Sequence, residues 1–187
     1  MKALPLTSLA VALAAALSAP AMAQDGSSKD GLEPYVGVMG GMHDFDNDQY
    51  KGSPPSGYRG WLVEGVAGAN YNMGKFFVGA EGSLAKGVDK DIDWEYGAAG
   101  RAGIRAGKDS IIFGKVGYQW TKFDDSARPL VNTNRHYDGT TYGFGVELST
   151  ADMGGSSDSS NVRLRAQVDT RGDFHSFRPM AGIVAKF

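Results

Sequence analysis

The segment from Asn161 to Arg171 constrains the fold of this chain more than any other stretch. Apolar or small residues alternate from Val162 to Thr170, and the residues between them are arginine, glutamine and aspartate. Side chains on a strand point alternately to opposite faces, whereas a helix would scatter these charges around its axis. The segment is therefore predicted to be a β-strand with one apolar and one charged face. A soluble barrel would turn the charges outward to water, and a membrane barrel would turn them into its lumen.

The first 23 residues are expected to be a cleaved signal peptide. Lys2 is followed by the apolar run Leu4 to Leu17 and by the small-residue cleavage pattern Ala21-Met22-Ala23. The run is too short to cross a hydrocarbon core of about 30 Å comfortably. No later stretch is apolar enough for a membrane helix, so any membrane role must use strands. We expect a flexible periplasmic leader over residues 24–33 and a barrel over residues 34–187.

Composition narrows the class of protein. A chain of 187 residues suits one domain, and 27 glycines are about twice the ordinary usage, which fits sheets with close backbone approach. A net charge of -2 gives no nucleic-acid signature. Because there is no cysteine, disulfides and thiolate metal sites are excluded.

Seven further segments alternate in the same way, which makes eight strands. The expected strands cover residues 35–42, 61–71, 76–84, 96–106, 112–121, 140–148 and 161–171, with a last strand that ends at Phe187. Every strand confines its charges to one parity, and from the second strand onward the connections are expected to alternate between short and long. Aromatic residues on the apolar parity gather near strand ends, as in the girdles of membrane barrels. The outer girdle is Trp61, Tyr96, Trp120, Tyr142 and Phe177, and the inner one is Tyr71, Phe76 and Phe187. The sequence therefore predicts an all-β, eight-stranded antiparallel up-and-down transmembrane β-barrel.

Four short motifs resemble the small outer-membrane β-barrel family, which includes the transmembrane domain of outer membrane protein A, outer membrane protein X and the opacity-type proteins. They are residues 35–41 (YVGVMGG), 114–118 (GKVGY), 142–147 (YGFGVE) and 181–187 (AGIVAKF). The resemblance implies the outer membrane of a Gram-negative bacterium, contact with its lipid and lipopolysaccharide, and recognition of Phe187 by the barrel-assembly machinery. We expect a monomer. Ala185 stands where many members carry a second aromatic residue, and Pro179 in the last strand is expected near the outer rim or at a bulge.

The charged parity defines a lumen set. It comprises Glu64, Glu81, Arg101, Arg105, Lys115, Glu147, Arg163, Arg165, Asp169, Arg178 and Lys186. Eight strands leave an interior just wide enough for side chains, and buried charges must pair. We therefore expect a structural ion network in two parts, Glu81–Arg101 and Lys115–Glu147–Arg163/Arg165. The alternative is a narrow, gated small-solute channel, which the cationic excess of this set would make anion-preferring.

Other candidate chemistry is weak. The acidic loop residues 44–48 start like a calcium loop, but Gln49 and Pro55 stand where that loop needs glycine and glutamate. His175 and Ser176 are adjacent and so face opposite sides of a strand, which leaves no catalytic pair. We expect no enzyme activity, no cofactor and no metal. Residues 171–173 match the integrin-binding tripeptide, which also recurs by chance. A structural or surface-interaction role is the leading hypothesis, and an adhesin acting through the outer loops is a further alternative.

Overall fold

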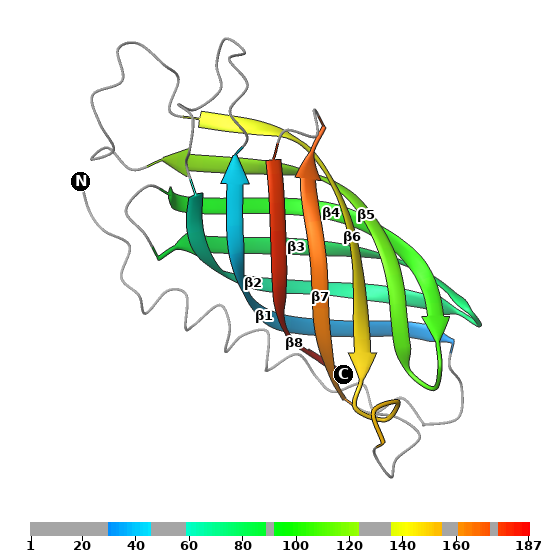
Figure 1. The fold of residues 1–187 in the computed structure, drawn as a ribbon. Coiled ribbons are helices and arrows are strands. Elements are labelled where there is room, and N and C mark those ends of the chain that lie inside the picture. Colours follow the sequence, from blue (N-terminus) through cyan, green and yellow to red (C-terminus); the bar gives the residue numbers. More distant parts are fainter. Residues whose placement is uncertain (1–29, 46–58, 89–91, 124–135, 155–160, 173–175) are drawn as a thin grey trace, which may run out of the picture.

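The chain forms one closed antiparallel barrel, which confirms the predicted fold class (Figure 1). The computed structural model describes residues 30–45, 59–88, 92–123, 136–154, 161–172 and 176–187. Its strands are β1 (Gly31–Phe45), β2 (Arg59–Met73), β3 (Phe76–Gly87), β4 (Ile92–Ala106), β5 (Ser110–Phe123), β6 (His136–Ser149), β7 (Val162–Arg171) and β8 (Ser176–Lys186). Each strand pairs with the next in the chain, and β8 pairs with β1. Among the described residues, no helix is long and apolar enough to cross a bilayer.

The strands extend further than the alternation predicts. β1 starts at Gly31, which pairs with Asn72 of β2, so residues 31–33 belong to the barrel and not to a flexible leader. β4 starts at Ile92, four residues before the expected strand. Residues 92–95 continue the alternation with Ile92 and Trp94, but they follow an acidic stretch and were expected to belong to the loop. The expected signal peptide lies outside the described residues.

The barrel has two distinct ends. The first strand residue Gly31, the last strand residue Lys186 and the tight β2–β3 and β4–β5 turns mark one of them, which we call the terminal end. The opposite end, where β1, β3, β5 and β7 finish, we call the loop end. The expected alternation of short and long connections fails for the last pair. The β6–β7 connection at the terminal end covers residues 150–161, whereas the β7–β8 connection at the loop end covers only residues 172–175.

Two turns at the terminal end need glycine. Gly74 and Gly107 adopt φ values of 63° and 70°, in the left-handed region that other residues rarely adopt. The β4–β5 turn is also held by Asp152 from the β6–β7 connection. Its carboxylate accepts hydrogen bonds from Lys108 N at 2.6 Å, Ser110 N at 2.9 Å and Ser110 Oγ at 2.6 Å. These bonds tie two connections that are distant in the sequence.

The wall separates an apolar outside from a polar inside, as the alternation predicts. In β7, for example, Arg163, Arg165, Gln167 and Asp169 are buried while the residues between them are exposed or partly exposed. Several inward positions are glycines, and they make room for large inward side chains. A β-carbon at Gly145 would lie 2.5 Å from Phe113 Cζ, and one at Gly68 would lie 2.5 Å from the Tyr35 hydroxyl. The glycine excess thus increases the usable volume of a narrow lumen.

The seven girdle aromatics in the strands all lie on the outer wall. Their exposed fractions run from 37% to 63%, for Trp61, Tyr71, Phe76, Tyr96, Trp120, Tyr142 and Phe177. Tyr96 stacks on Trp120 with ring centroids 5.3 Å apart, and Tyr118 meets Trp120 edge-on at 4.9 Å. Tyr142 pairs with Val116 in the middle of β5, so its expected position at a strand end is wrong, because β6 starts four residues before the expected strand. The role of the other six in a membrane interface stays a prediction.

Pro179 lies at an interruption of the closing seam. The β1–β8 register runs from Tyr35↔Lys186 to Gly41↔Met180 and resumes at Asp44↔Phe177. Met42 and His43 are skipped opposite Pro179 and Arg178, although the register is the same on both sides. Proline has no N–H to donate, so this is a local loss of pairing near the loop end and not a bulge.

The outward position of Val116 can be tested by introducing a charge. Val116 is half-exposed near the middle of β5, and Val116→Arg should lower the free energy of unfolding in lipid by about 2–4 kcal/mol, because a cation would lie in hydrocarbon. Val116→Leu, the apolar control, should change it little. Urea titration in lipid vesicles measures both variants, and equal stability would mean that this face does not meet hydrocarbon.

The hydrogen bonds that the Asp152 carboxylate accepts should make the stability of the barrel depend on pH. Hydrogen bonds from the Ser110 hydroxyl and from the backbone N–H groups of Lys108 and Asp109 lower the pKa of the Asp152 carboxyl. A lowered pKa stabilises the fold above the unfolded value of about 3.9 and loses that effect as pH falls through the folded value. Asp152→Asn should therefore lower the urea midpoint at pH 7, with a difference from wild type that shrinks below about pH 4. A difference of the same size at pH 7 and pH 2 would contradict this assignment.

Candidate functional site in the barrel lumen

The sequence predicted eleven charged residues on the inward face of the strands. The ten of them other than Lys186 all point into the barrel. Eight of them are almost fully buried: Glu64, Glu81, Arg101, Glu147, Arg163, Arg165, Asp169 and Arg178. The side chains of Arg105 and Lys115 are each 10% exposed, and that of Lys186 is 12% exposed. The structure therefore brings the whole set into one lumen.

Four charges form the centre of the lumen. Arg165 Nη1 lies 2.5 Å from Glu81 Oε2, and Arg165 Nη2 lies 2.6 Å from Glu147 Oε1. Arg101 bridges the same two carboxylates at 3.2 and 2.8 Å. The Tyr35 hydroxyl donates to Glu81 at 2.8 Å and accepts from Arg101 at 2.8 Å. Both arginines thus join the two groups of residues that the sequence analysis kept apart, and the expectation of two separate networks is wrong.

Lys115 also differs from its expected role. It was expected to pair with Glu147, but its Nζ lies 3.1 Å from Asp169 and 3.5 Å from Glu81. Depth counted along single strands does not include the tilt of strands in a closed barrel, which shifts neighbouring strands past one another. Lys115 consequently links the centre of the network to its loop-end part.

The loop-end part is built around Glu95. His43 Nδ1 lies 3.0 Å from Glu95 Oε1, and Gln119 Nε2 donates to Glu95 Oε2 at 2.8 Å. Arg178 lies 3.6 Å from Glu95 and 3.8 Å from Asp169, and it also donates to Glu64. Six strands therefore contribute to a cluster at this end.

The terminal-end part is built around Arg163. Its guanidinium lies 2.8 Å from Glu33, 2.9 Å from Asp109 and 3.3 Å from Glu147. Arg105 reaches Glu33 at 3.2 Å, and Lys186 reaches Asp109 at 2.6 Å. Contacts of 4 Å or less therefore run without a break from His43 at the loop end to Lys186 at the terminal end.

Sequence reasoning missed several members of this network. Glu33 was assigned to the leader and Glu95 to a loop, because both lie in strand ends that the alternation did not reach. Asp109 lies in the β4–β5 turn, and Arg171 was left out of the set although it is buried and donates to Thr121 Oγ1 at 2.6 Å. Extending the alternation of inward-facing positions by two or three residues beyond each expected strand end would have included Glu33 and Glu95.

The added residues change the charge balance. In the described part of the chain, the lumen and its mouths hold seven carboxylates and eight cations. The carboxylates are Glu33, Glu64, Glu81, Glu95, Asp109, Glu147 and Asp169, and the cations are Arg101, Arg105, Lys115, Arg163, Arg165, Arg171, Arg178 and Lys186. The cationic excess falls from three in the predicted set to one.

Aromatic and apolar side chains fill the space between the charges. The Arg101 guanidinium lies 4.0 Å from the ring centroid of Phe113 and 4.9 Å from that of Tyr35. Buried Met39, Val66 and Met180 form one apolar cluster, and Phe77, Ile111 and Phe113 form another. The lumen is thus a packed core in which charges and apolar groups alternate.

The space left in the lumen is small. A cavity of about 20 Å³ lies beside Lys115, Asp169 and Gln119, enough for about one water molecule. Within the ranges that the structure describes, no three histidine, aspartate or glutamate side chains are grouped to hold a metal ion. This cavity is too small to hold a solute, and the described residues offer no metal centre.

Removing Glu147 should destabilise the barrel strongly. The carboxylate contacts Arg101, Arg163 and Arg165, so Glu147→Gln would leave three buried guanidinium groups short of counter-charge and cost about 3–5 kcal/mol. The double change with Arg165→Met should cost less than the sum of the single changes, because the pair is removed together. Urea unfolding in micelles measures each variant, with Leu148→Met on the outer wall as the control. Strictly additive losses would show that Glu147 and Arg165 do not interact.

Comparisons with known proteins agree with this architecture. Residues 9–176 match the family model described as "Outer membrane protein beta-barrel domain". No curated protein sequence matches the chain. Among solved structures, the chain is similar to Neisserial surface protein A (NspA), with a TM-score of 0.55 and 12% identity over 84% of this chain and 97% of that one.

A second solved structure is Ail, the attachment invasion locus protein of Yersinia pestis, in complex with the heparin analogue sucrose octasulfate. Its TM-score is 0.51, with 16% identity over 84% of this chain and 99% of that one. At these identities the likeness concerns the fold alone. The family model covers most of the chain, and the chain therefore belongs to the outer membrane protein β-barrel family, as an integral β-barrel protein of the outer membrane.

Proposed function

We propose that this barrel is a closed scaffold, with no catalytic role, that presents its loop end at the cell surface. The observation that carries the proposal is the unbroken ion network, which fills the lumen from His43 to Lys186. Each buried charge in this network has opposite charges close by, so opening a path would expose several unpaired groups at once. A lumen of this kind stabilises a scaffold and does not serve transport.

The loop end faces outward in this proposal. Residues 1–23 are removed as a signal peptide, and the terminal end then remains in the periplasm. The exposed aromatic residues near the two ends lie at the two membrane interfaces, with Trp61 and Trp120 on the outer side. The barrel acts as a monomer whose wall contacts lipid and lipopolysaccharide.

The channel alternative has less support than the scaffold. Its anion preference rested on a cationic excess of three, and the described lumen has an excess of one. The cavity beside Lys115 has room for about one water molecule. Neither feature favours a conducting pathway.

Adhesion through residues 171–173 is also disfavoured. Arg171 is 4% exposed, and its guanidinium donates to Thr121 Oγ1 inside the barrel. Asp173 lies outside the described residues. Ail, by the name of its structure, is an attachment protein, and NspA is named a surface protein. A surface role for this chain would therefore use the connections of the loop end, above all residues 46–58 and 124–135.

The closed lumen predicts the absence of steady conductance. Refolded protein in planar bilayers should show no stable current at physiological salt, because the network leaves no continuous water path. Glu147→Gln, which weakens the network, should show brief openings if it folds, and Val116→Leu should behave like wild type. Steady current through the wild-type barrel would overturn the scaffold proposal.

The surface role is tested with the same protein in vesicles. Replacing residues 46–57 by a short turn should leave the barrel folded and should remove binding to cultured epithelial cells or to immobilised heparin. Binding that survives this replacement and that of residues 124–135 would place the interaction elsewhere. Absence of binding by the wild type would leave a structural role.

We also propose that the barrel-assembly machinery recognises the last strand through Phe187. This residue is half-exposed, and its N–H donates to the Pro34 carbonyl at 2.9 Å, at the edge where the barrel closes. Deletion of Phe187 should leave unfolded protein in the periplasm, whereas Phe187→Trp should assemble normally. Electrophoresis of unheated membranes, in which a folded barrel migrates faster, distinguishes these results. Normal amounts of folded barrel after the deletion would contradict this role.

A further inference from the structure

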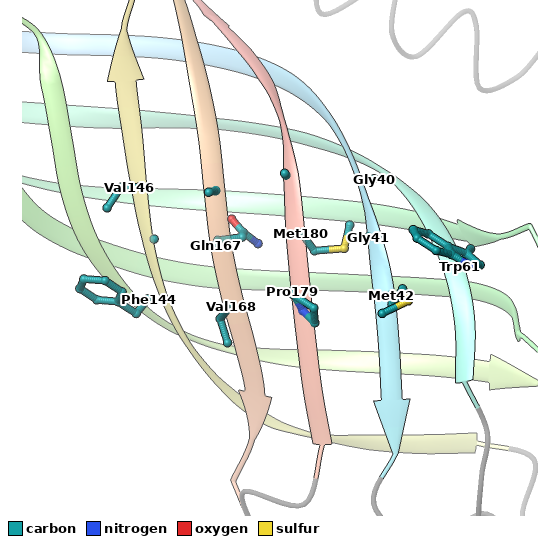
Figure 2. A pocket seen from close by; sticks show the side chains of 13 residues that line it. Gly40, Gly41, Met42, Trp61, Phe144, Val146, Gln167, Val168, Pro179 and Met180 are labelled. Carbon is teal, nitrogen blue, oxygen red and sulfur yellow. The ribbon is translucent and has the colours of Figure 1, made fainter. Parts of the chain in front are cut away.

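The outer wall carries an apolar groove that the lumen network does not explain. It has a volume of about 430 Å³ and crosses β6, β7, β8, β1 and β2 (Figure 2). Its floor is made of small residues, Ala166, Ala181 and Gly40. Bulky residues stand along its loop-end side, among them Phe144, Pro179 and Trp61 (Figure 2).

The strand register explains the groove. Val146, Ala166, Ala181 and Gly40 pair in one continuous row across four strands. The next outward-facing row toward the terminal end, Leu148, Leu164, Ile183 and Val38, is bulky and exposed. Three small residues in succession, Ala166, Ala181 and Gly40, lie between two rows of large ones and therefore form a channel along the wall. Because neighbouring strands lie 4.7–4.9 Å apart, its path from β6 to β2 is about 19 Å long.

The row of paired positions that contains the floor residues continues across further strands to a lysine. It continues from Gly40 to Val63 of β2, then to Lys86 of β3 and Trp94 of β4. Lys86 is exposed, and its Nζ lies 4.7 Å from the centroid of the Trp94 ring. This cation–π contact holds the ammonium group beside aromatic residues close to the loop end of the wall. The lining of the groove ends at β2, and the row of paired positions continues by one more strand to this positive charge near the loop end of the wall.

We propose that the groove binds one acyl chain of an outer-leaflet phosphorylated glycolipid, the lipid A part of lipopolysaccharide, and that Lys86 binds its phosphate. The wall of an integral barrel faces hydrocarbon, so an acyl chain is the apolar partner that is always present there. The length of the groove is comparable to one leaflet, about 15 Å of a 30 Å core. Lys86 supplies the matching charge for a headgroup phosphate at the end where that phosphate would lie. The site rests on the proposed outward position of the loop end.

The chain offers matched variants for a test. A β-carbon at Gly40 would meet only the Leu62 carbonyl, at 3.9 Å, so Gly40→Leu should fold and fill the groove. Gly100 on the opposite wall has equal space, with the Val116 carbonyl at 4.0 Å, and Gly100→Leu is its control. Ala166→Leu fills the same floor from another strand. For the cation, Lys86→Gln is compared with Lys75→Gln at the terminal end.

The readout is native mass spectrometry of folded barrels from detergent micelles that contain lipid A, either phosphorylated or dephosphorylated. Wild type should retain one lipid A. Gly40→Leu and Ala166→Leu should weaken retention of both lipids about tenfold, the equivalent of 1.4 kcal/mol. Lys86→Gln should weaken retention of the phosphorylated lipid alone, about fivefold, since one surface lysine contributes about 1 kcal/mol. The two controls should match wild type.

Three results would overturn the proposal. Equal retention by wild type and both filled-groove variants would mean that lipid contacts the wall without a site. A Lys86→Gln effect of the same size on both lipids would remove the phosphate contact. A wild-type dimer that Gly40→Leu abolishes would show that a second barrel occupies the groove. Conductance is measured separately, so a leaking lumen would overturn the scaffold proposal and leave this site standing.

Discussion

The structure depends on one constraint: a closed eight-stranded wall must hold many charges in an interior barely wide enough for side chains. In the described part of the chain, seven carboxylates and eight cations share this space, and most of them lie within 4 Å of at least one opposite charge. A single continuous network results because every strand contributes inward charges at different depths. Removing any one member of this network would leave its partners as unpaired buried charges, so the network favours one arrangement of the interior.

The wall follows from the same constraint. Charges can be confined inside only if each strand alternates strictly, which leaves the outside apolar and suited to hydrocarbon. Inward glycines supply the volume that arginine and phenylalanine need, as at Gly145 beside Phe113. Outward small residues at Gly40, Ala166 and Ala181 instead produce a groove, because nothing inside the protein fills the space they leave. Glycine and alanine thus act differently on the two faces of one sheet.

The sequence predicted which residues belong to the candidate site better than it predicted which of them contact one another. Alternation placed Glu81, Arg101 and Arg165 on one face, since a period of two needs no tertiary information, and the membrane class made that face the inward one. It did not identify Glu33 or Glu95, because Glu33 was assigned to the leader and Glu95 to a loop, although Trp94 and Tyr96 flank Glu95. The ion-pair partners of these residues were harder to predict than the residues themselves. Lys115 contacts Asp169 and Glu81, because strand tilt brings residues of different depths together.

The sequence by itself determined the number of strands and their two faces, because both follow from alternation and its interruptions. The aromatic residues on the apolar faces indicated the membrane class of the barrel. Only the tertiary structure decided that the lumen holds one network instead of two and that its charges nearly balance. It also decided that Arg171 reaches Thr121 across the lumen, and that small residues of three strands align into a groove in the wall. Those features depend on the register between strands, and a period of two within each strand says nothing about how far neighbouring strands slide past one another.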